Sequence, residues 1–422
     1  MTKPLASGIR RRSLIQRSLG AGAVIGASQL GAPFILSARG EVPIKVGMIN
    51  PLTGTLSALA RTEVEGSQYG FDEINKKGGI LGREVQLLVE DSNNDVGTGV
   101  QKARKLFDRD NIDVLFGDVN SAISLALAQV SSQQGKLHIV TGGHTDAITG
   151  KDCHWNVFRV CNSTVMDASA IAQVLMDKLG KKWFFMTPDY AYGHSVQDAF
   201  EKKLKTGGGT SDGVLAPLGT SDFSAYLIKA QAAQPDVFIC LMGGQDQVNC
   251  LKQFVQFGLD KRMKLGGALF EFELIQSSPP ETRFGWWDME WYWNQPNIPG
   301  VKAFADGIKA KTGNVATARH WFGYVACHSL ALAAAKAKSL DGVALSRAME
   351  GLELPPEIAM STEKAYYRAG DHQLMSGVLV GEAQNPPAGG DKNDLYKVIT
   401  TVPGEMAAGP VADSGCTVKF PA

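Results

Sequence analysis

The sequence lacks an excess of charge of either sign, and it lacks the common metal-binding motifs. Lysine plus arginine and aspartate plus glutamate both number 42 in 422 residues, so the chain offers no net positive field to nucleic acid. Its seven histidines are scattered and form no H-E-x-x-H sequence, and no zinc-ligand spacing is present. We therefore expect no nucleic-acid partner, no metal ion, no cofactor and no enzymatic activity.

Cysteines are few, and none falls in a C-x-x-C pair. A chain of this size does not need disulfides to form a core, although an exported one permits them. Cys153 and Cys161 bracket HWNVFRV, so a bridge between them is one pairing that we expect, while spacing alone does not determine connectivity. Cys240 and Cys250 fall on a predicted buried strand and on the helix that follows it, where packed free thiols are expected.

Long apolar runs are also scarce, and beyond residue 40 no stretch of the sequence is long and apolar enough to span a membrane. In the first 40 residues, the arginines of Arg10–Arg12 precede an apolar stretch over Leu19–Leu36 that is rich in glycine and alanine. A transmembrane anchor is the alternative, but Ser28, Gln29 and Pro33 make this stretch too weakly apolar. We expect residues 1–40 to be a twin-arginine-like signal peptide for export to the periplasm, and the segment has no cysteine for a lipoprotein anchor.

The clearest structural unit that the sequence does contain is residues 44–95. Ile44–Ile49 is rich in β-branched residues and predicts a strand, which ends at a loop with proline and glycine. A helix follows, with Val64, Phe71 and Ile74 at helical spacing, and Val85–Val89 predicts the second strand. The first loop has no phosphate-binding glycine pattern. In such open α/β units, ligands bind at the carboxyl ends of the strands.

Three segments of this unit resemble one family. PLTG at 51–54, EINKKGGILGR at 73–83 and EDSNND at 90–95 are similar to the opening of the type I periplasmic solute-binding proteins of ABC importers, in the branched-chain amino-acid-binding (Leu/Ile/Val-binding-like) group. The resemblance continues to about Gln384. It implies a monomeric periplasmic receptor that binds a small-molecule ligand and works with the membrane permease of an ABC importer.

The rest of the chain alternates strand and helix patterns, which favours an α/β fold with parallel sheets flanked by helices. One sheet would hold too many strands for a compact body, so we expect two. The resemblance implies two Rossmann-like lobes joined by a hinge of three crossings, near Asn162, Trp291 and Ala365. Lobe one is expected over residues 43–162 plus 293–365, and lobe two over residues 163–292 plus 366–422. The aromatic segment FGWWDMEWYWNQ is expected to form the second crossing.

Candidate ligand residues in lobe one lie after predicted strands. A helix starts at Asn120 or Ser121, and helix N-termini favour anions such as a carboxylate, although Ser121 could simply cap the helix. The resemblance implies that Ser121, with the neighbouring Ala122, binds a ligand carboxylate. It also implies that Gly143 and Thr145 of the loop TGGHTD hold the head group of an α-amino acid. The intervening histidine of this loop is expected to be a surface residue.

Candidate residues in lobe two come from the same resemblance. DYAYG at 189–193 is similar to the family's D-x-x-Y-G turn, which implies that Tyr192 closes on the ligand; a tyrosine packed at a helix start is the alternative. Leu59 matches a side-chain contact of the family. The family's glutamate for the ligand ammonium group aligns with Leu269 or Phe270, and Glu271 is adjacent.

These residues predict the class of ligand. An apolar wall opposite a carboxylate site suits a small organic acid with an aromatic or aliphatic body. A branched-chain amino acid is the main alternative, because Glu271 would pair with its ammonium group if the side chain lay in the pocket. An amide- or urea-type ligand, or a ligand sensor on the same fold, is a further alternative, and an enzyme is the least favoured.

Overall fold

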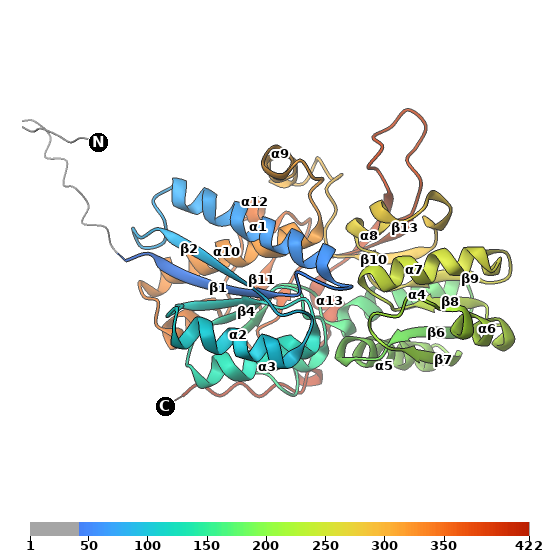
Figure 1. Cartoon of the computed structure of the whole chain (residues 1–422), viewed down its shortest axis with the longest axis horizontal. Helices are drawn as coiled ribbons and strands as arrows, with labels where there is room; N and C mark the ends of the chain where they lie inside the picture. Colours follow the sequence, from blue (N-terminus) through green and yellow to red (C-terminus); the bar gives the residue numbers. More distant parts are fainter. Residues whose placement is uncertain (1–41, 422) are drawn as a thin grey trace, which may run out of the picture. The chain divides into compact units, whose positions relative to one another are not determined.

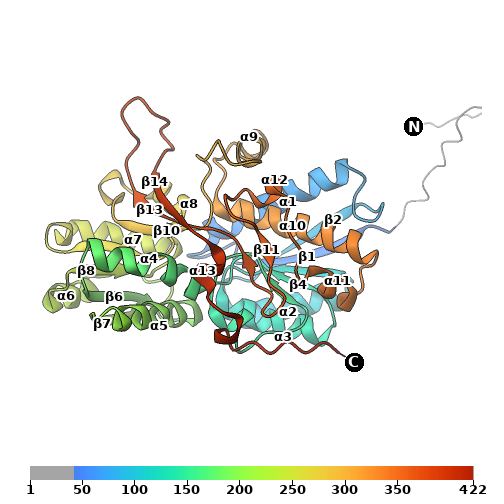
Figure 2. The ribbon, with the colours of Figure 1, turned by 180° about the vertical axis from the view of Figure 1, so that it is seen from behind.

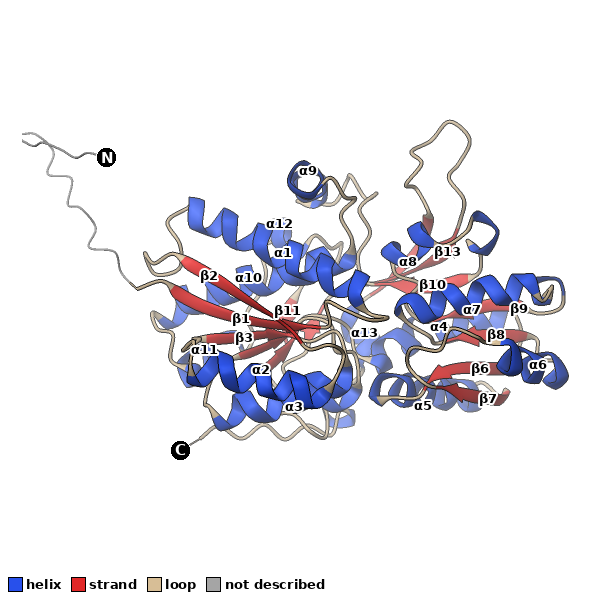
Figure 3. Ribbon diagram, viewed as in Figure 1, coloured by secondary structure: helices blue, strands red, loops and turns tan. Residues whose placement is uncertain are grey.

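The computed structural model of the chain describes residues 42–421, so the signal peptide expected over residues 1–40 lies outside the described residues. The described residues form two lobes, each built around a central sheet with helices on both faces (Figure 1 and Figure 3). This confirms the predicted α/β fold class. Among residues 42–421, no helix combines the length and the apolar character needed to cross a membrane.

The first sheet has five parallel strands in the order β2-β1-β3-β4-β5. Its strands are β1 (Ile44–Asn50), β2 (Val85–Asp91), β3 (Val114–Gly117), β4 (His138–Val140) and β5 (Val157–Arg159). One face packs against α1 (Ser57–Lys76) and α10 (Ala318–Ala337), and the other against α2 (Val96–Asp108) and α3 (Ser121–Gln133). The smaller helices α9 (Val301–Thr312), α11 (Gly342–Met349) and α12 (Pro356–Ala359) belong to the same lobe.

The second sheet has seven strands in the order β14-β13-β10-β9-β8-β6-β7. The parallel strands are β6 (Lys182–Pro188), β7 (Thr210–Ala216), β8 (Val237–Cys240), β9 (Lys264–Gly267) and β10 (Trp286–Met289). β13 (Val378–Ala383) and β14 (Tyr396–Val402) add an antiparallel edge. One face packs against α4 (Thr164–Lys178) and α5 (Ala191–Thr206), and the other against α6 (Ser224–Ala233), α7 (Gly244–Gln256) and α8 (Phe272–Ser277).

Strand β10 is a correction to the sequence analysis, which assigned its aromatic segment to a crossing. Trp287, Asp288 and Met289 are all buried, so this central strand shows no alternation of polar and apolar residues. A strand buried on both faces has no period of two to detect. The crossing begins only after β10.

Three crossings join the two sheets. They follow β5, β10 and the hairpin of β11 (Tyr366–Tyr367) and β12 (Leu374–Met375). The hairpin still contacts the first lobe, where Gln373 pairs with Arg159 of β5. The division at residues 162, 293 and 366 stays a prediction: the strands of the two sheets fall on the expected sides, while the hairpin lies against the first lobe.

The C-terminal tail makes a further passage between the lobes. After β14, the helix α13 (Gly404–Ala408) packs on α4 of the second lobe, and the chain then returns to the first lobe (Figure 2). There Cys416 forms a disulfide with Cys153, across a sequence separation of 263 residues. The expected Cys153–Cys161 bridge is therefore wrong, because Cys161 is a free thiol buried in the core of the first lobe. Cys240 and Cys250 are buried free thiols, as predicted.

Candidate ligand-binding site

A small pocket lies where the carboxyl ends of strands from the two sheets meet. Val119 follows β3, His144 follows β4, Tyr190 follows β6 and Met242 follows β8, and all four line the pocket. The cavity has a volume of about 20 Å³. Its lining is completed by Leu56, Leu59, Ser121, Tyr192, Gly243, Leu269, Glu271 and Arg319. The pocket occupies the position at which open α/β sheets bind ligands.

Ser121 presents its hydroxyl group to this pocket. The N-cap of α3 is Asn120, whose side-chain oxygen accepts a hydrogen bond of 2.9 Å from the amide of Ala122. Ser121 is thus free of the capping role. Its Oγ accepts hydrogen bonds from the amides of His144 and Thr145, at 3.1 and 3.2 Å. Because both of these bonds use the oxygen as acceptor, the hydroxyl proton can be donated to a ligand oxygen.

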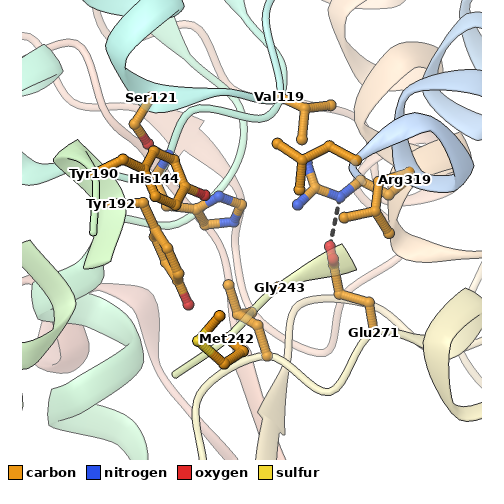
Figure 4. A pocket seen from close by; sticks show the side chains of 12 residues that line it. Val119, Ser121, His144, Tyr190, Tyr192, Met242, Gly243, Glu271 and Arg319 are labelled. Atoms are coloured by element: carbon orange, nitrogen blue, oxygen red, sulfur yellow. Dashed lines mark hydrogen bonds and ion pairs between the residues drawn. The ribbon is translucent and has the colours of Figure 1, made fainter. Parts of the chain in front are cut away.

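His144 is buried and lines the pocket, so the expectation of a surface histidine is wrong. Its Nδ1 lies 2.8 Å from the carbonyl oxygen of Gly142, and its Nε2 lies 3.1 Å from a carboxylate oxygen of Glu290. Glu290 directly follows β10, at the start of the second crossing, so this crossing lies against the loop and buries the histidine. Both ring nitrogens face protein acceptors, so the imidazole presents its ring to the pocket beside Tyr192 (Figure 4).

Arg319 is the charged pocket residue that the sequence analysis missed, and five uncharged lining residues were not predicted either: Leu56, Val119, Tyr190, Met242 and Gly243. It lies in the first turn of α10, and its guanidinium group pairs with Glu63 of α1 at 2.7 Å and with Glu271. Glu63 is itself fully buried and accepts hydrogen bonds from Asn50 at 3.0 Å and Thr141 at 2.8 Å. The signal in the sequence is an arginine at the start of a largely apolar helix, because a buried arginine requires a carboxylate partner.

The absence of a side chain at Gly142 leaves room for the ion pair between Glu63 and Arg319 next to the loop after β4. A Cβ atom at this position would lie 2.3 Å from a carboxylate oxygen of Glu63 and 2.4 Å from Nη1 of Arg319. Neither side chain can retreat easily, because both are buried and paired. The small residue at the end of β4 is therefore a steric requirement of the buried network.

Glu271 reaches the pocket from the loop before α8 and faces Arg319 (Figure 4). Burial raises its pKa to about 8, while the charge of Arg319 acts in the opposite direction. Leu269, with a positive φ of 50°, lines the pocket, whereas Phe270 turns into the core against Trp287. The loop thus places Leu269 and Glu271 on the pocket side.

The structure brings together four of the predicted ligand residues and separates the other four from the pocket wall. Residues of the first group are Leu59, Ser121, Tyr192 and Glu271. Ala122, Gly143, Thr145 and Phe270 do not line the cavity. The amides of Ala122 and Thr145 donate to the oxygens of Asn120 and Ser121, so these two amides are already occupied within the protein. The assignment of all eight as ligand contacts stays a prediction.

Comparison with known proteins identifies the family. The periplasmic binding protein profile matches residues 43–391. The chain belongs to the periplasmic binding protein family. It is 26% identical over 351 residues to Leu/Ile/Val-binding protein homolog 1 of Brucella melitensis biotype 1, and the match covers 81% of this chain and 91% of that protein. A Leu/Ile/Val-binding protein of Rhizobium johnstonii is 32% identical over 197 residues, which cover 46% of this chain and 53% of that one.

Solved structures of the family show the same fold. A periplasmic binding protein from Burkholderia mallei superposes with a TM-score of 0.83 at 26% identity, covering 89% of this chain and 98% of that one. A solute-binding protein of an ABC transporter from Rhodopseudomonas palustris BisB5, in complex with 3,4-dihydroxybenzoic acid, gives a TM-score of 0.77 at 20% identity, covering 86% and 98%. The second likeness concerns the fold alone.

Family membership establishes the general function. The protein is an extracytoplasmic solute-binding receptor of the ABC transporter type, and it is not an enzyme. Receptors of this type bind a small molecule and work with a membrane permease.

Proposed function

We propose that the protein captures a small ligand that bears a carboxylate group, and that this ligand is an α-amino acid with an apolar side chain. The observation that carries this proposal is the arrangement of one pocket, in which the Ser121 hydroxyl and the Glu271 carboxylate face an apolar wall. In Figure 4, Ser121, His144 and the two tyrosines lie on one side, and Arg319 and Glu271 lie opposite. A ligand between them would be held at both ends.

The Ser121 hydroxyl group suits the carboxylate end of such a ligand, because it lies across the pocket from Glu271 (Figure 4). The Ser121 hydroxyl proton has no acceptor among residues 42–421, since the hydroxyl oxygen only accepts bonds there. Arg319 uses Nε and Nη1 for its carboxylate partners, and Nη2 has no hydrogen bond to any residue in that range. A hydroxyl group can donate to a ligand carboxylate, whereas Arg319 lies beside Glu271, on the side of the ammonium end (Figure 4).

Glu271 suits the ammonium end. The network contains two carboxylates, Glu63 and Glu271, for the single guanidinium of Arg319, so it carries one net negative charge when all three groups are ionised. A zwitterionic ligand supplies a cation to this network, whereas a bare organic acid adds a further negative charge. The sequence-based preference for an organic acid depended on Glu271 lying outside the pocket, and the side chain lies inside it.

The size of the cavity limits how the ligand enters. A volume of about 20 Å³ is close to that of one water-sized probe. A ligand with an apolar side chain therefore requires the lobes to separate and side chains such as Met242 and Leu269 to move. Hinge closure around a ligand is the motion expected of two lobes joined by three crossings.

Titration calorimetry with matched ligands tests the proposal. We expect L-leucine to bind more tightly than 4-methyl-2-oxopentanoate, and L-phenylalanine more tightly than 3-phenylpropanoate, because only the amino acids bring an ammonium group. Glu271→Gln should remove this preference while keeping the volume of the side chain. Tighter binding of the des-amino acids would reject the amino-acid proposal in favour of an organic acid. Acetamide and urea belong in the same series, since binding of a neutral amide alone would reject the carboxylate class.

Two further proposals rest on the sequence alone. We propose export by the twin-arginine route, which rests on Arg10–Arg12 and the apolar stretch that follows. We also propose that the receptor works as a monomer without contact to nucleic acid. Size-exclusion chromatography with light scattering tests whether the receptor is a monomer, and the mass of a dimer would contradict this proposal.

A further inference from the structure

We propose that Arg159, together with Gln373, is a positioning unit that fixes the ligand loop 143–145 to the third crossing and thereby sets the affinity of the pocket. Neither residue lines the pocket beside Ser121. Arg159 ends β5, and Gln373 precedes β12 in the crossing hairpin. The inference rests on the proposed function only where ligand affinity is concerned.

Arg159 holds the loop through its backbone carbonyl groups. Its Nη1 donates to the carbonyl oxygens of Thr145 at 2.6 Å and His144 at 3.0 Å, with a longer contact of 3.4 Å to Gly143. The amides of His144 and Thr145 are the two donors to the Ser121 hydroxyl. The backbone at His144 and Thr145 therefore accepts hydrogen bonds from Arg159 through its carbonyl groups and donates hydrogen bonds to Ser121 through its amide groups.

The remaining nitrogens of Arg159 reach the hinge. Nε donates to the side-chain oxygen of Gln373 at 2.6 Å, and Nη2 donates to the Thr149 hydroxyl at 2.5 Å. The amide nitrogen of Gln373 donates to the carbonyl oxygens of Cys161 at 2.7 Å and Leu374 at 3.1 Å. Gln373 therefore links two crossings, the one after β5 and the one at β12. Three short hydrogen bonds in series, from Cys161 to Gln373, from Gln373 to Arg159 and from Arg159 to Thr145, therefore connect the hinge to the ligand loop.

The partners of Arg159 argue for a positioning role. The side chain is fully buried, and among residues 42–421 none of its hydrogen bonds goes to a carboxylate. Burial lowers the pKa of this guanidinium group. An apolar residue of similar size would avoid this desolvation cost. An apolar residue could not hold three consecutive carbonyl groups in one orientation. Arginine can, because its planar guanidinium group carries five N–H donors.

A cavity on the far side of Arg159 makes the inference testable by chemical rescue. This cavity has a volume of about 320 Å³, and its lining includes Arg159, Thr149, Gln373, Lys202 and Ser169. Removal of the arginine side chain would join its space to this cavity. A guanidinium-bearing molecule such as ethylguanidinium could then enter and restore the missing donors.

Hydrogen exchange in the ligand-free full chain is the first test. In Arg159→Ala we expect the amides of residues 143–145 to exchange faster, with the strands of the second sheet unchanged, and millimolar ethylguanidinium to restore protection. The milder Thr149→Val should show part of the effect. Ser169→Ala is the matched control, because it lines the same cavity and should leave this loop unchanged. Unchanged protection in a folded Arg159→Ala variant, or equally faster exchange in every strand, would overturn the proposal.

A double-mutant cycle is the second test, with L-leucine as the probe. If the unit acts through Ser121, the losses of affinity in Thr149→Val and Ser121→Ala should not multiply, since the second change removes the group that the first disturbs. We expect about ten-fold weaker binding in Ser121→Ala and no further loss in the double variant. Losses that multiply would overturn the proposal. Absence of L-leucine binding by the parent would reject the proposed amino-acid function, and the exchange experiment would still decide the role of Arg159.

Discussion

At the scale of single residues, the proposal that the pocket binds a ligand carboxylate depends on the hydroxyl group of Ser121. Its oxygen accepts two amide hydrogen bonds, so its proton can still be donated. Ser121→Ala should weaken binding of L-leucine by about ten-fold, because a hydrogen bond to a charged group contributes about 1.5–3 kcal/mol. Ser132→Ala, near the other end of the same helix and outside the pocket lining, is the control. Equal affinity of the two variants in calorimetry would contradict the assignment.

Glu271 predicts a pH dependence of binding with a defined sign. Burial raises the pKa of its carboxyl group to about 8, so the ligand-free protein holds a proton there below that pH. An ammonium group binds the ionised form, so an amino acid should release this proton on binding. Its affinity should therefore rise between about pH 6 and pH 8 and then level off.

Calorimetry in buffers of different ionisation enthalpy measures this proton directly. Glu271→Gln, which cannot ionise, should bind with an affinity that is flat over the same range. An organic acid has the opposite sign, because its negative charge favours the protonated carboxyl group, and its affinity should fall as the pH rises through about 8. Proton uptake with L-leucine would therefore contradict the ammonium contact.

At the scale of elements, the C-terminal tail depends on its disulfide. Residues 411–421 contain no regular strand, and most of them are exposed or half-buried, so few apolar contacts hold this segment. Cys416 joins Cys153, and Phe420 lies against Arg347 and Trp155. We expect Cys153→Ser with Cys416→Ser to lower the free energy of unfolding by about 2–4 kcal/mol, the typical contribution of a disulfide.

Two measurements check this prediction. Urea unfolding gives the change in stability, and hydrogen exchange should show faster exchange over residues 409–421, with the central sheets unchanged. Parent protein with and without dithiothreitol is the matched control, because the other four cysteines are free and buried. A tail that stays protected after loss of the disulfide would show that the aromatic contacts are sufficient.

At the scale of the whole molecule, the rims of the two lobes meet through a few hydrogen bonds. The Thr55 hydroxyl donates to Asp246 at 2.6 Å, and the Thr62 hydroxyl donates to Glu273 at 2.7 Å. Both acceptors are carboxylates, and a hydrogen bond to a charged group contributes about 1.5–3 kcal/mol. Thr55→Val with Thr62→Val should therefore weaken ligand binding by about ten-fold or more by destabilising the closed arrangement.

Small-angle scattering checks the closure itself. We expect the parent to become more compact with saturating L-leucine and the double variant to need more ligand for the same change. Lys302→Ala, on the exposed helix α9, serves as a control that leaves the interface intact. No compaction at saturation would contradict a hinge that closes on the ligand.

The sequence by itself determined the fold class, the family and most of the strands and helices, because these follow from local patterns. The β-branched run before PLTG became β1, and the helix from Ser57 ends at Lys76 beside its glycines. Ser121 and Tyr192 reached the pocket because each follows a strand at its carboxyl end, which chain order alone reveals.

Only the tertiary structure decided which distant side chains meet. Arg319 lies 256 residues from Glu63 and 48 from Glu271, and Cys416 lies 263 from Cys153. No local pattern carries such pairings, because each depends on the packing of helices onto both sheets and on the course of the hinge. Tertiary packing likewise places Phe270 in the core and Glu271 at the pocket, after Leu269 with its positive φ of 50°. The charge of the pocket depends on that placement.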